Sequence, residues 1–259
     1  MKDVQGSRDH RGITLQKAGV KDIYLPLEIR VPDGSYQPVL ARVSLSADLS
    51  HECRGTHMSR FVEELYGWSR RKLSSIEVKE ILEAVRKSLG ARRAEIELDF
   101  RYFIAKSTPV SEAMSLLDYE CQFSGVLMEE EFLFRLGVKI PLHILCPCSR
   151  EISHFGAHNQ RAVLKVRVHY PESAFIWIEE LVSGLEPLGS AAIFPLLKRA
   201  DEKYVTEQAY ENPKFVEDVV RDAVLLLRSD SRIDWFEVEC ESAESIHNHS
   251  AFAYHSESR

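Results

Sequence analysis

Two cysteines and a histidine near the middle of the chain have side chains that bind metal ions. Cys146 and Cys148 flank a single proline after a β-rich run, and His158 follows in a stretch typical of a turn. Thiolate and imidazole are natural ligands of zinc and similar metals. Cys-x-Cys alone is a weak motif, because two nearby cysteines can simply be small buried hydrophobes. A metal site and plain burial are therefore the two interpretations of this segment.

A pair of imidazoles lies close to the end of the chain. His247 and His249 come just after the last predicted strand, and a continuing strand would aim both side chains the same way. Two histidines on one face suit metal binding or proton transfer. The alternative is an unstructured surface patch, which is common near a chain terminus.

Three further features carry charge. Residues 197–207 are dense in both signs of charge, and the default interpretation of such a run is a solvated helix face. Glu217 can likewise be a surface acid paired with Arg221, four residues on. Arg60 opens a predicted helix, where hydroxyls and an arginine suit either an anion site or a simple cap.

Glycine-rich phosphate motifs are absent from the sequence. It contains neither GxxxxGK[ST] nor GxGxxG, which argues against a P-loop ATPase and against a Rossmann dehydrogenase. The residues by themselves thus lead no further than a candidate metal site with Cys, His and Glu ligands.

The elements that must position these residues follow from hydrophobic periodicity. Period-2 alternation predicts strands, and apolar spacing near 3.6 predicts helices. The predicted strands cover residues 39–45, 94–104, 164–168 and 236–240, with longer β-rich runs at 23–31 and 132–145. The predicted helices cover residues 58–68, 75–89, 174–185 and 213–227, and 191–211 is expected to be partly helical. Gly90 is expected to end the second helix, and Asn212 and Pro213 are expected to begin the last.

The order of these elements predicts an α+β fold of two halves. Strands, two helices and strands are followed by strands, helices and a closing strand, so we expect a division between 105 and 120. We place it after residue 110, giving halves 1–110 and 111–259.

Composition narrows the class of protein. With 44% hydrophobic and 28% charged residues among 259, the chain should fold compactly and not be disordered or fibrous. A net charge of −7 gives no attraction to nucleic acid or to an anionic membrane. Five cysteines at irregular spacing do not form a disulfide framework. No spanning apolar run or secretory signal is present, so a cytoplasmic location is expected.

Five blocks in order resemble the type IB GTP cyclohydrolases, and the resemblance covers nearly the whole chain. They are GTHMSRF at 55–61, LCPCSREIS at 145–153, GAHNQR at 156–161, LLKRADEKYVTEQAYENPKFVEDVVR at 196–221 and ESIHNHSAFA at 244–253. The resemblance implies a bimodular tunnelling fold, in which two antiparallel sheets each carry helices on one face. It also implies a homotetramer with active sites at subunit interfaces.

The resemblance assigns roles to individual residues. Its metal ligands map onto Cys146, His158 and Glu202, with Cys148 as the second choice, and zinc, manganese or ferrous iron suits this mixed set. Its proton-transferring histidines map onto His247 and His249, and Cys146 counts among the catalytic residues. Its guanine-binding carboxylate maps onto Glu217. The candidates for holding the triphosphate are Arg60, Lys198 and Arg199.

The implied activity is metal-dependent hydrolysis of GTP to formate and 7,8-dihydroneopterin triphosphate. This is the first step towards tetrahydrofolate and related pterins or deazapurines. Three alternatives stay open: an archaeal-type enzyme with a cyclic phosphate product, a non-catalytic protein with a structural metal, and another tunnelling-fold pterin enzyme.

Overall fold

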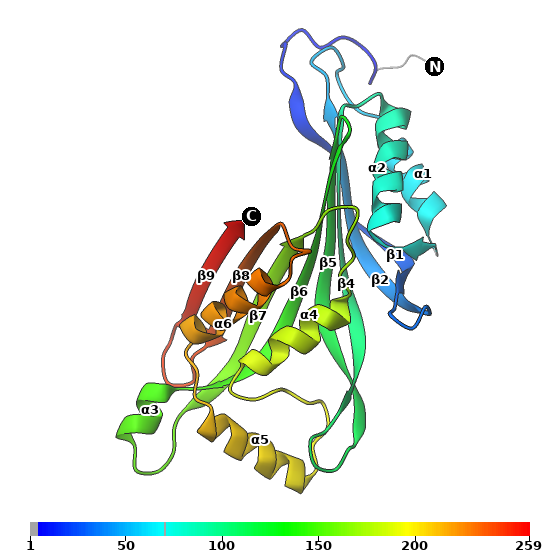
Figure 1. Cartoon of the computed structure of the whole chain (residues 1–259). Coiled ribbons are helices and arrows are strands. Elements are labelled where there is room, and N and C mark those ends of the chain that lie inside the picture. The colour runs from blue at the N-terminus through cyan, green and yellow to red at the C-terminus, as the bar shows by residue number, and fades with distance from the viewer. Residues whose placement is uncertain (1–4, 70) are drawn as a thin grey trace. The chain divides into compact units, whose positions relative to one another are not determined.

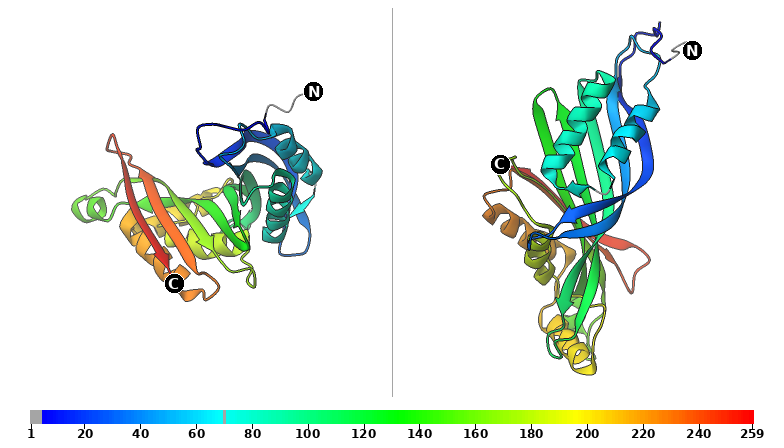
Figure 2. Two further views of the ribbon diagram at one scale, coloured as in Figure 1. Left: turned by 90° about the horizontal axis from the view of Figure 1, so that it is seen from above. Right: turned by 90° about the vertical axis from the view of Figure 1, so that its right-hand side faces the viewer.

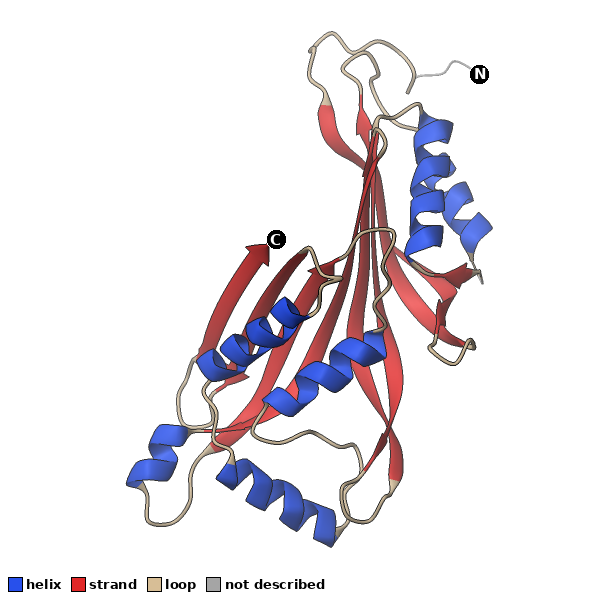
Figure 3. Cartoon of the chain, viewed as in Figure 1, coloured by secondary structure: helices blue, strands red, loops and turns tan. Residues whose placement is uncertain are grey.

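Long antiparallel strands with helices against them make up the structure (Figure 3). The computed structural model describes residues 5–69 and 71–259. The strands are β1 Leu15–Arg30, β2 Tyr36–Leu49, β3 Lys72–Leu73, β4 Arg93–Ser107, β5 Met114–Met128, β6 Glu131–Leu145, β7 Asn159–His169, β8 Trp235–Ala243 and β9 Ser250–Ser258. The helices are α1 Met58–Trp68, α2 Ser75–Leu89, α3 Pro147–Ile152, α4 Ile178–Leu185, α5 Arg199–Glu211 and α6 Val216–Ser229, with a 3-10 turn at Glu186–Leu188.

The chain forms two compact units. Unit 1 contains residues 1–101 and 122–136, and unit 2 contains residues 102–121 and 137–259. Strands β4, β5 and β6 therefore give residues to both units. The expected division after residue 110 stays a prediction.

Unit 1 packs α1 and α2 against its strands, as two views show (Figures 1 and 2). Its strands follow the order β3-β1-β2-β4-β5-β6, and β1 pairs with β2 antiparallel and with the short β3 in parallel. Helix α2 begins with a capping box between Ser74 and Glu77 and ends at Gly90, whose φ of 64° is left-handed. Both predicted helices of this half are confirmed.

Unit 2 continues the same pattern in its own strands. Their order is β4-β5-β6-β7-β8-β9, and helices α4 and α6 lie on one face of this sheet (Figure 1). The buried face of α6 carries Val219, Ala223 and Leu227 at helical spacing, opposite Phe236 and Val238 of β8. The expected antiparallel strands with helices on one face are therefore confirmed.

The start of α6 differs from the prediction. Asn212 does not cap it and Pro213 is not its first residue, because α6 begins at Val216 after Phe215. The Asn212 side chain instead donates to the carbonyl oxygens of Gly189 (3.0 Å) and Ser190 (3.4 Å). The amide of Lys214 donates to the carbonyl of Leu145 (3.1 Å). These tertiary contacts hold the segment extended and delay the helix.

Other boundaries also differ. Helix α4 begins at Ile178, because residues 171–174 form a turn in which the Ala174 amide donates to the Pro171 carbonyl (2.9 Å). The helical part of 191–211 is α5. Strands β5 and β9 and the short helix α3 were not predicted. Within the two described ranges, no helix has the length and apolar character to cross a membrane.

Candidate active site

Cys146 and His158 lie together at the end of β6. Cys146 caps the short helix α3, and its Sγ accepts a hydrogen bond from the Ser149 amide (3.4 Å). The Cys146 amide donates to the His158 carbonyl (3.1 Å), and the His158 amide donates to Ser149 Oγ (3.1 Å). The structure thus joins two of the predicted metal ligands through backbone contacts. Cys146 is partly buried, whereas Cys148 is exposed.

The imidazole of His158 is fixed by a side-chain network. Its Nδ1 lies 3.0 Å from Oε1 of Gln160, a buried residue at the start of β7. Gln160 Nε2 in turn donates to Glu244 Oε1 (2.9 Å), which also accepts from Ser242 Oγ (2.9 Å). Ser245 Oγ donates to Gln160 Oε1 (3.4 Å). Gln160 and Glu244 were not among the predicted site residues.

His247 and His249 lie on the loop that joins β8 to β9. As predicted they follow a strand, but that strand does not continue through them, because β8 ends at Ala243 and β9 begins only at Ser250. Their rings nevertheless stack, with centroids 5.1 Å apart and planes at 16°. Both side chains are exposed, so they are free to meet a ligand.

Helix α5 begins at a buried carboxylate. Asp201 is fully buried and accepts hydrogen bonds from the amides of Val110 (2.9 Å), Ser111 (2.8 Å) and Lys198 (3.0 Å), and from Ser111 Oγ (2.5 Å). Burial alone would raise the pKa of Asp201, but the Ser111 side-chain bond and the backbone bonds outweigh it and hold that pKa well below its usual range. The charged run is therefore more than a solvated face, since one of its acids fixes the helix.

One face of α5 packs beside the Cys146 segment. Val205 and Ala209 belong to an apolar cluster with Leu145, Ala157 and Ala191. Leu145 precedes Cys146 and Ala157 precedes His158, and Glu202 lies one helical turn before Val205. The Arg150 guanidinium of α3 also lies 4.8 Å from the centre of the Tyr210 ring of α5. In the described ranges no three or more His, Cys, Asp or Glu residues form a group that could hold a metal ion.

The predicted substrate residues lie on three helices. Lys198 and Arg199 are exposed at the start of α5, and Glu217 is exposed in the first turn of α6. Burial, followed by the charge of Glu217, raises the pKa of the Cys240 thiol on β8 to about 12. Arg60 belongs to unit 1, where its Nη1 donates to the Ser88 carbonyl (2.7 Å) near the end of α2.

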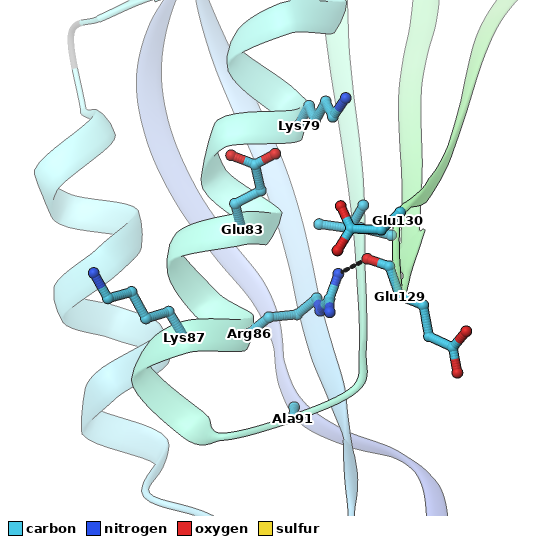
Figure 4. A pocket seen from close by; sticks show the side chains of 8 residues that line it. Lys79, Glu83, Arg86, Lys87, Ala91, Glu129 and Glu130 are labelled. Atoms are coloured by element: carbon cyan, nitrogen blue, oxygen red, sulfur yellow. Dashed lines mark hydrogen bonds between the residues drawn. The ribbon is translucent and has the colours of Figure 1, made fainter.

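A hollow of about 380 Å³ in unit 1 lies between α2 and the turn from β5 to β6 (Figure 4). Its lining balances three basic side chains against three acidic ones, and Arg86 already donates to the Glu129 carbonyl. None of its lining residues is a predicted site residue: Lys79, Glu83, Arg86, Lys87, Ala91, Leu127, Glu129 and Glu130.

Comparison with known proteins gives consistent results. The model of a family described as type I GTP cyclohydrolase folE2 matches residues 1–253. Proteins named GTP cyclohydrolase FolE2 from Geotalea uraniireducens and Geobacter sulfurreducens are each 51% identical over 253 residues. These matches span 98% of this chain and 92% and 96% of those proteins.

Solved structures confirm the fold. A uricase from Bacillus fastidious matches with a TM-score of 0.58 at 8% identity, covering 94% of this chain and 93% of that one. A uricase from Arthrobacter globiformis matches with a TM-score of 0.56 at the same identity and coverage. At this identity the likeness concerns the fold alone, which is the expected α+β tunnelling fold.

Proposed function

Because the chain belongs to the type I GTP cyclohydrolase FolE2 family, we propose that it opens GTP at a site built on Cys146 and His158. It is an enzyme with GTP cyclohydrolase I activity in folate biosynthesis, a hydrolase of cyclic amidine C–N bonds. The proposed products are formate and 7,8-dihydroneopterin triphosphate. The observation that supports this site most directly is the hydrogen bond from the Cys146 amide to the His158 carbonyl, beside which the His158 amide donates to Ser149 Oγ of the same segment.

The donors at this site fit a divalent metal. Cys146 offers a free, partly buried thiol, and His158 has its Nδ1 engaged by Gln160, which leaves Nε2 for a ligand. Glu202 is the proposed third donor, supported by the packing of its helix beside both segments. When bound, zinc, manganese or ferrous iron supplies the Lewis acidity that activates water for hydrolysis.

The loop histidines are the proposed proton carriers. Ring opening and release of formate both require protons to move to and from purine nitrogens. An imidazole can accept and donate protons near neutral pH. His247 and His249 are exposed and stacked, and we assign the larger role to His247.

Substrate recognition is assigned to charged residues of unit 2 and to Arg60. The Glu217 carboxylate can accept two parallel hydrogen bonds from guanine N1–H and its amino group, which adenine cannot offer. Lys198 and Arg199 stand at a helix N-terminus, where their two positive charges favour the triphosphate. Arg60 is the third proposed phosphate contact, although its guanidinium also bonds to Ser88.

The proposed assembly is a cytoplasmic homotetramer with its active sites at subunit interfaces. Such an assembly would let one site draw residues from neighbouring chains. Light scattering on the purified protein tests it, and an active monomer would contradict it.

One assay tests the proposed activity. Purified protein loaded with zinc, manganese or iron is incubated with GTP, and formate and the mass of the pterin are measured beside a chelator-treated sample. Formate with a linear triphosphate is the expected result. A cyclic phosphate would favour the archaeal-type reaction, and no formate with any metal would favour a structural metal.

Two variants test the ligand assignment. Cys146→Ser should abolish turnover and metal binding, whereas Cys148→Ser, two residues away and exposed, is the matched control. The opposite pattern would move the ligand role to Cys148.

A further inference from the structure

A polar patch interrupts the apolar inner face of β7 and β8. The inward residues of β7 are Gln160 followed by Ala162, Leu164, Val166 and Val168, so only the first is polar. Those of β8 are Phe236, Val238, Cys240 and Ser242, and Ser242 pairs with Ala162 in the ladder. Gln160 is 9% exposed and Ser242 is fully buried. Buried polar side chains are costly unless they are hydrogen-bonded, and both of these point towards Glu244.

The network determines which way the Gln160 amide faces. An ionised carboxylate only accepts hydrogen bonds, so Gln160 must present its Nε2 to Glu244 Oε1. Its Oε1 then faces His158 and also accepts from Ser245 Oγ. Because that oxygen is an acceptor, His158 must carry its proton on Nδ1. In the neutral imidazole, Nε2 then carries the lone pair that can bind a metal.

We propose that Gln160 and Glu244 are positioning residues that fix the tautomer of His158 as the metal ligand. The same amide ties His158 to the loop carrying His247 and His249, because Glu244 and Ser245 begin that loop. This proposal rests on the ligand role of His158 given above. Partners that orient a ligating histidine in this way generally change metal affinity 10- to 100-fold when removed.

The first test is the tautomer of His158 in metal-free protein. Nitrogen-15 NMR of histidine-labelled protein at alkaline pH distinguishes protonated Nδ1 from protonated Nε2, and His158→Gln identifies the signal by its loss. The natural protein should show Nδ1–H. In Glu244→Gln, the new amide can donate as well as accept, so Gln160 can turn over and both tautomers should appear. Glu239→Gln on β8 is the matched control, since Glu239 pairs with Lys165 at the surface, and it should change nothing.

The second test is zinc affinity, measured by competition with a chelator. Glu244→Gln is isosteric and should fold normally, and Gln160→Leu should weaken zinc binding by about 10- to 100-fold. The proposal would be overturned if His158 kept the same tautomer in both Glu244→Gln and Gln160→Leu. It would also be overturned if the natural protein showed Nε2–H. Unchanged zinc affinity despite an altered tautomer would also overturn it. If His158→Gln also binds zinc normally, the ligand role of His158 fails as well, which separates the two failures.

Discussion

Lys106 and Glu186 form a largely buried ion pair, and removing one partner should lower the stability of the fold. Both side chains are only 13% exposed, and Lys106 Nζ lies 2.5 Å from Glu186 Oε1. The ammonium also donates to the Ile193 carbonyl (2.6 Å) and lies 4.2 Å from the centre of the Phe194 ring. Burial lowers the pKa of Lys106, and the hydrogen bond and charge of Glu186 act against this. The pair holds the segment that leads into α5.

Lys106→Met should lower the free energy of unfolding by about 3–5 kcal/mol. Methionine keeps much of the apolar stem, so the loss is mainly electrostatic. Among the residues that the structure describes, only the Tyr119 hydroxyl, 3.1 Å away, would still donate to Glu186 Oε1, and the Ile193 carbonyl would lose its ammonium partner. Leaving one charge of a buried pair without the other is the costly part of the change.

Urea unfolding followed by circular dichroism measures this change. Lys139→Met is the matched control, because Lys139 and Glu120 form an ion pair that is 51% and 49% exposed. That variant should lose less than about 1 kcal/mol. The double variant Lys106→Met/Glu186→Met should recover at least about 1 kcal/mol of the single variant's loss. Equal losses for Lys106→Met and the control, or strictly additive losses in the double variant, would refute the reasoning.

Three further predictions concern acid stability, thiol reactivity and substrate binding. The hydrogen bond from Arg228 lowers the pKa of Glu257 from 4.5 to about 2. The ion pair therefore stabilises the fold fully at pH values above 4.5, and this stabilisation is lost as the pH falls towards 2. The urea midpoint of Glu257→Gln should therefore fall below that of the natural protein at pH 7, and the gap should close in acid. Cys240, whose pKa burial raises to about 12, should resist alkylation at pH 8 while exposed Cys148 reacts; equal labelling by mass spectrometry would contradict its burial. Glu217→Gln should weaken GTP binding by about 2 kcal/mol, roughly 30-fold, in equilibrium titration, and unchanged affinity would remove Glu217 from the pocket.

Local sequence patterns were sufficient to predict a helix or strand where one of its faces is apolar. Strand β4 was predicted from alternation, because every second residue from Ala94 to Tyr102 is buried. Strand β9 was missed because it has no buried face, and Phe252 and Tyr254 are both exposed. The predicted start of α6 was wrong because the Asn212 side chain bonds to residues that are distant in sequence. Tertiary contacts of this kind override the intrinsic preference of a residue for a helix end.

The candidate site divides in the same way. Cys146 and His158 could be proposed from the sequence, because thiolate and imidazole are metal-binding groups whatever surrounds them, and their ligand role stays a prediction. Gln160 and Asp201 could not be, because each acts through a partner far along the chain. Gln160 bonds to Glu244, 84 residues away, and Asp201 bonds to Ser111, 90 residues away. Nothing in the residue type of a glutamine or an aspartate indicates such a partner.

Buried polar groups show where the structure of unit 2 is specified most strongly. In the parts of the chain that the structure describes, six polar or charged residues are buried, and five of them belong to unit 2. All five bond to segments near the proposed site residues. Ser190 bonds to Leu145 before Cys146, Gln160 bonds to His158, and Ser242 bonds to Glu244. Asp201 bonds to the start of α5, and Thr108 bonds to Ser111, which in turn bonds to Asp201. Apolar side chains in a core can repack at little cost in stability. A buried polar group, by contrast, loses the hydrogen bond that offsets its desolvation once its partner moves. The Cys146, His158 and Lys198 side chains are partly or fully exposed, so we infer that these buried contacts of unit 2, more than the packing of those side chains, fix the segments that carry them.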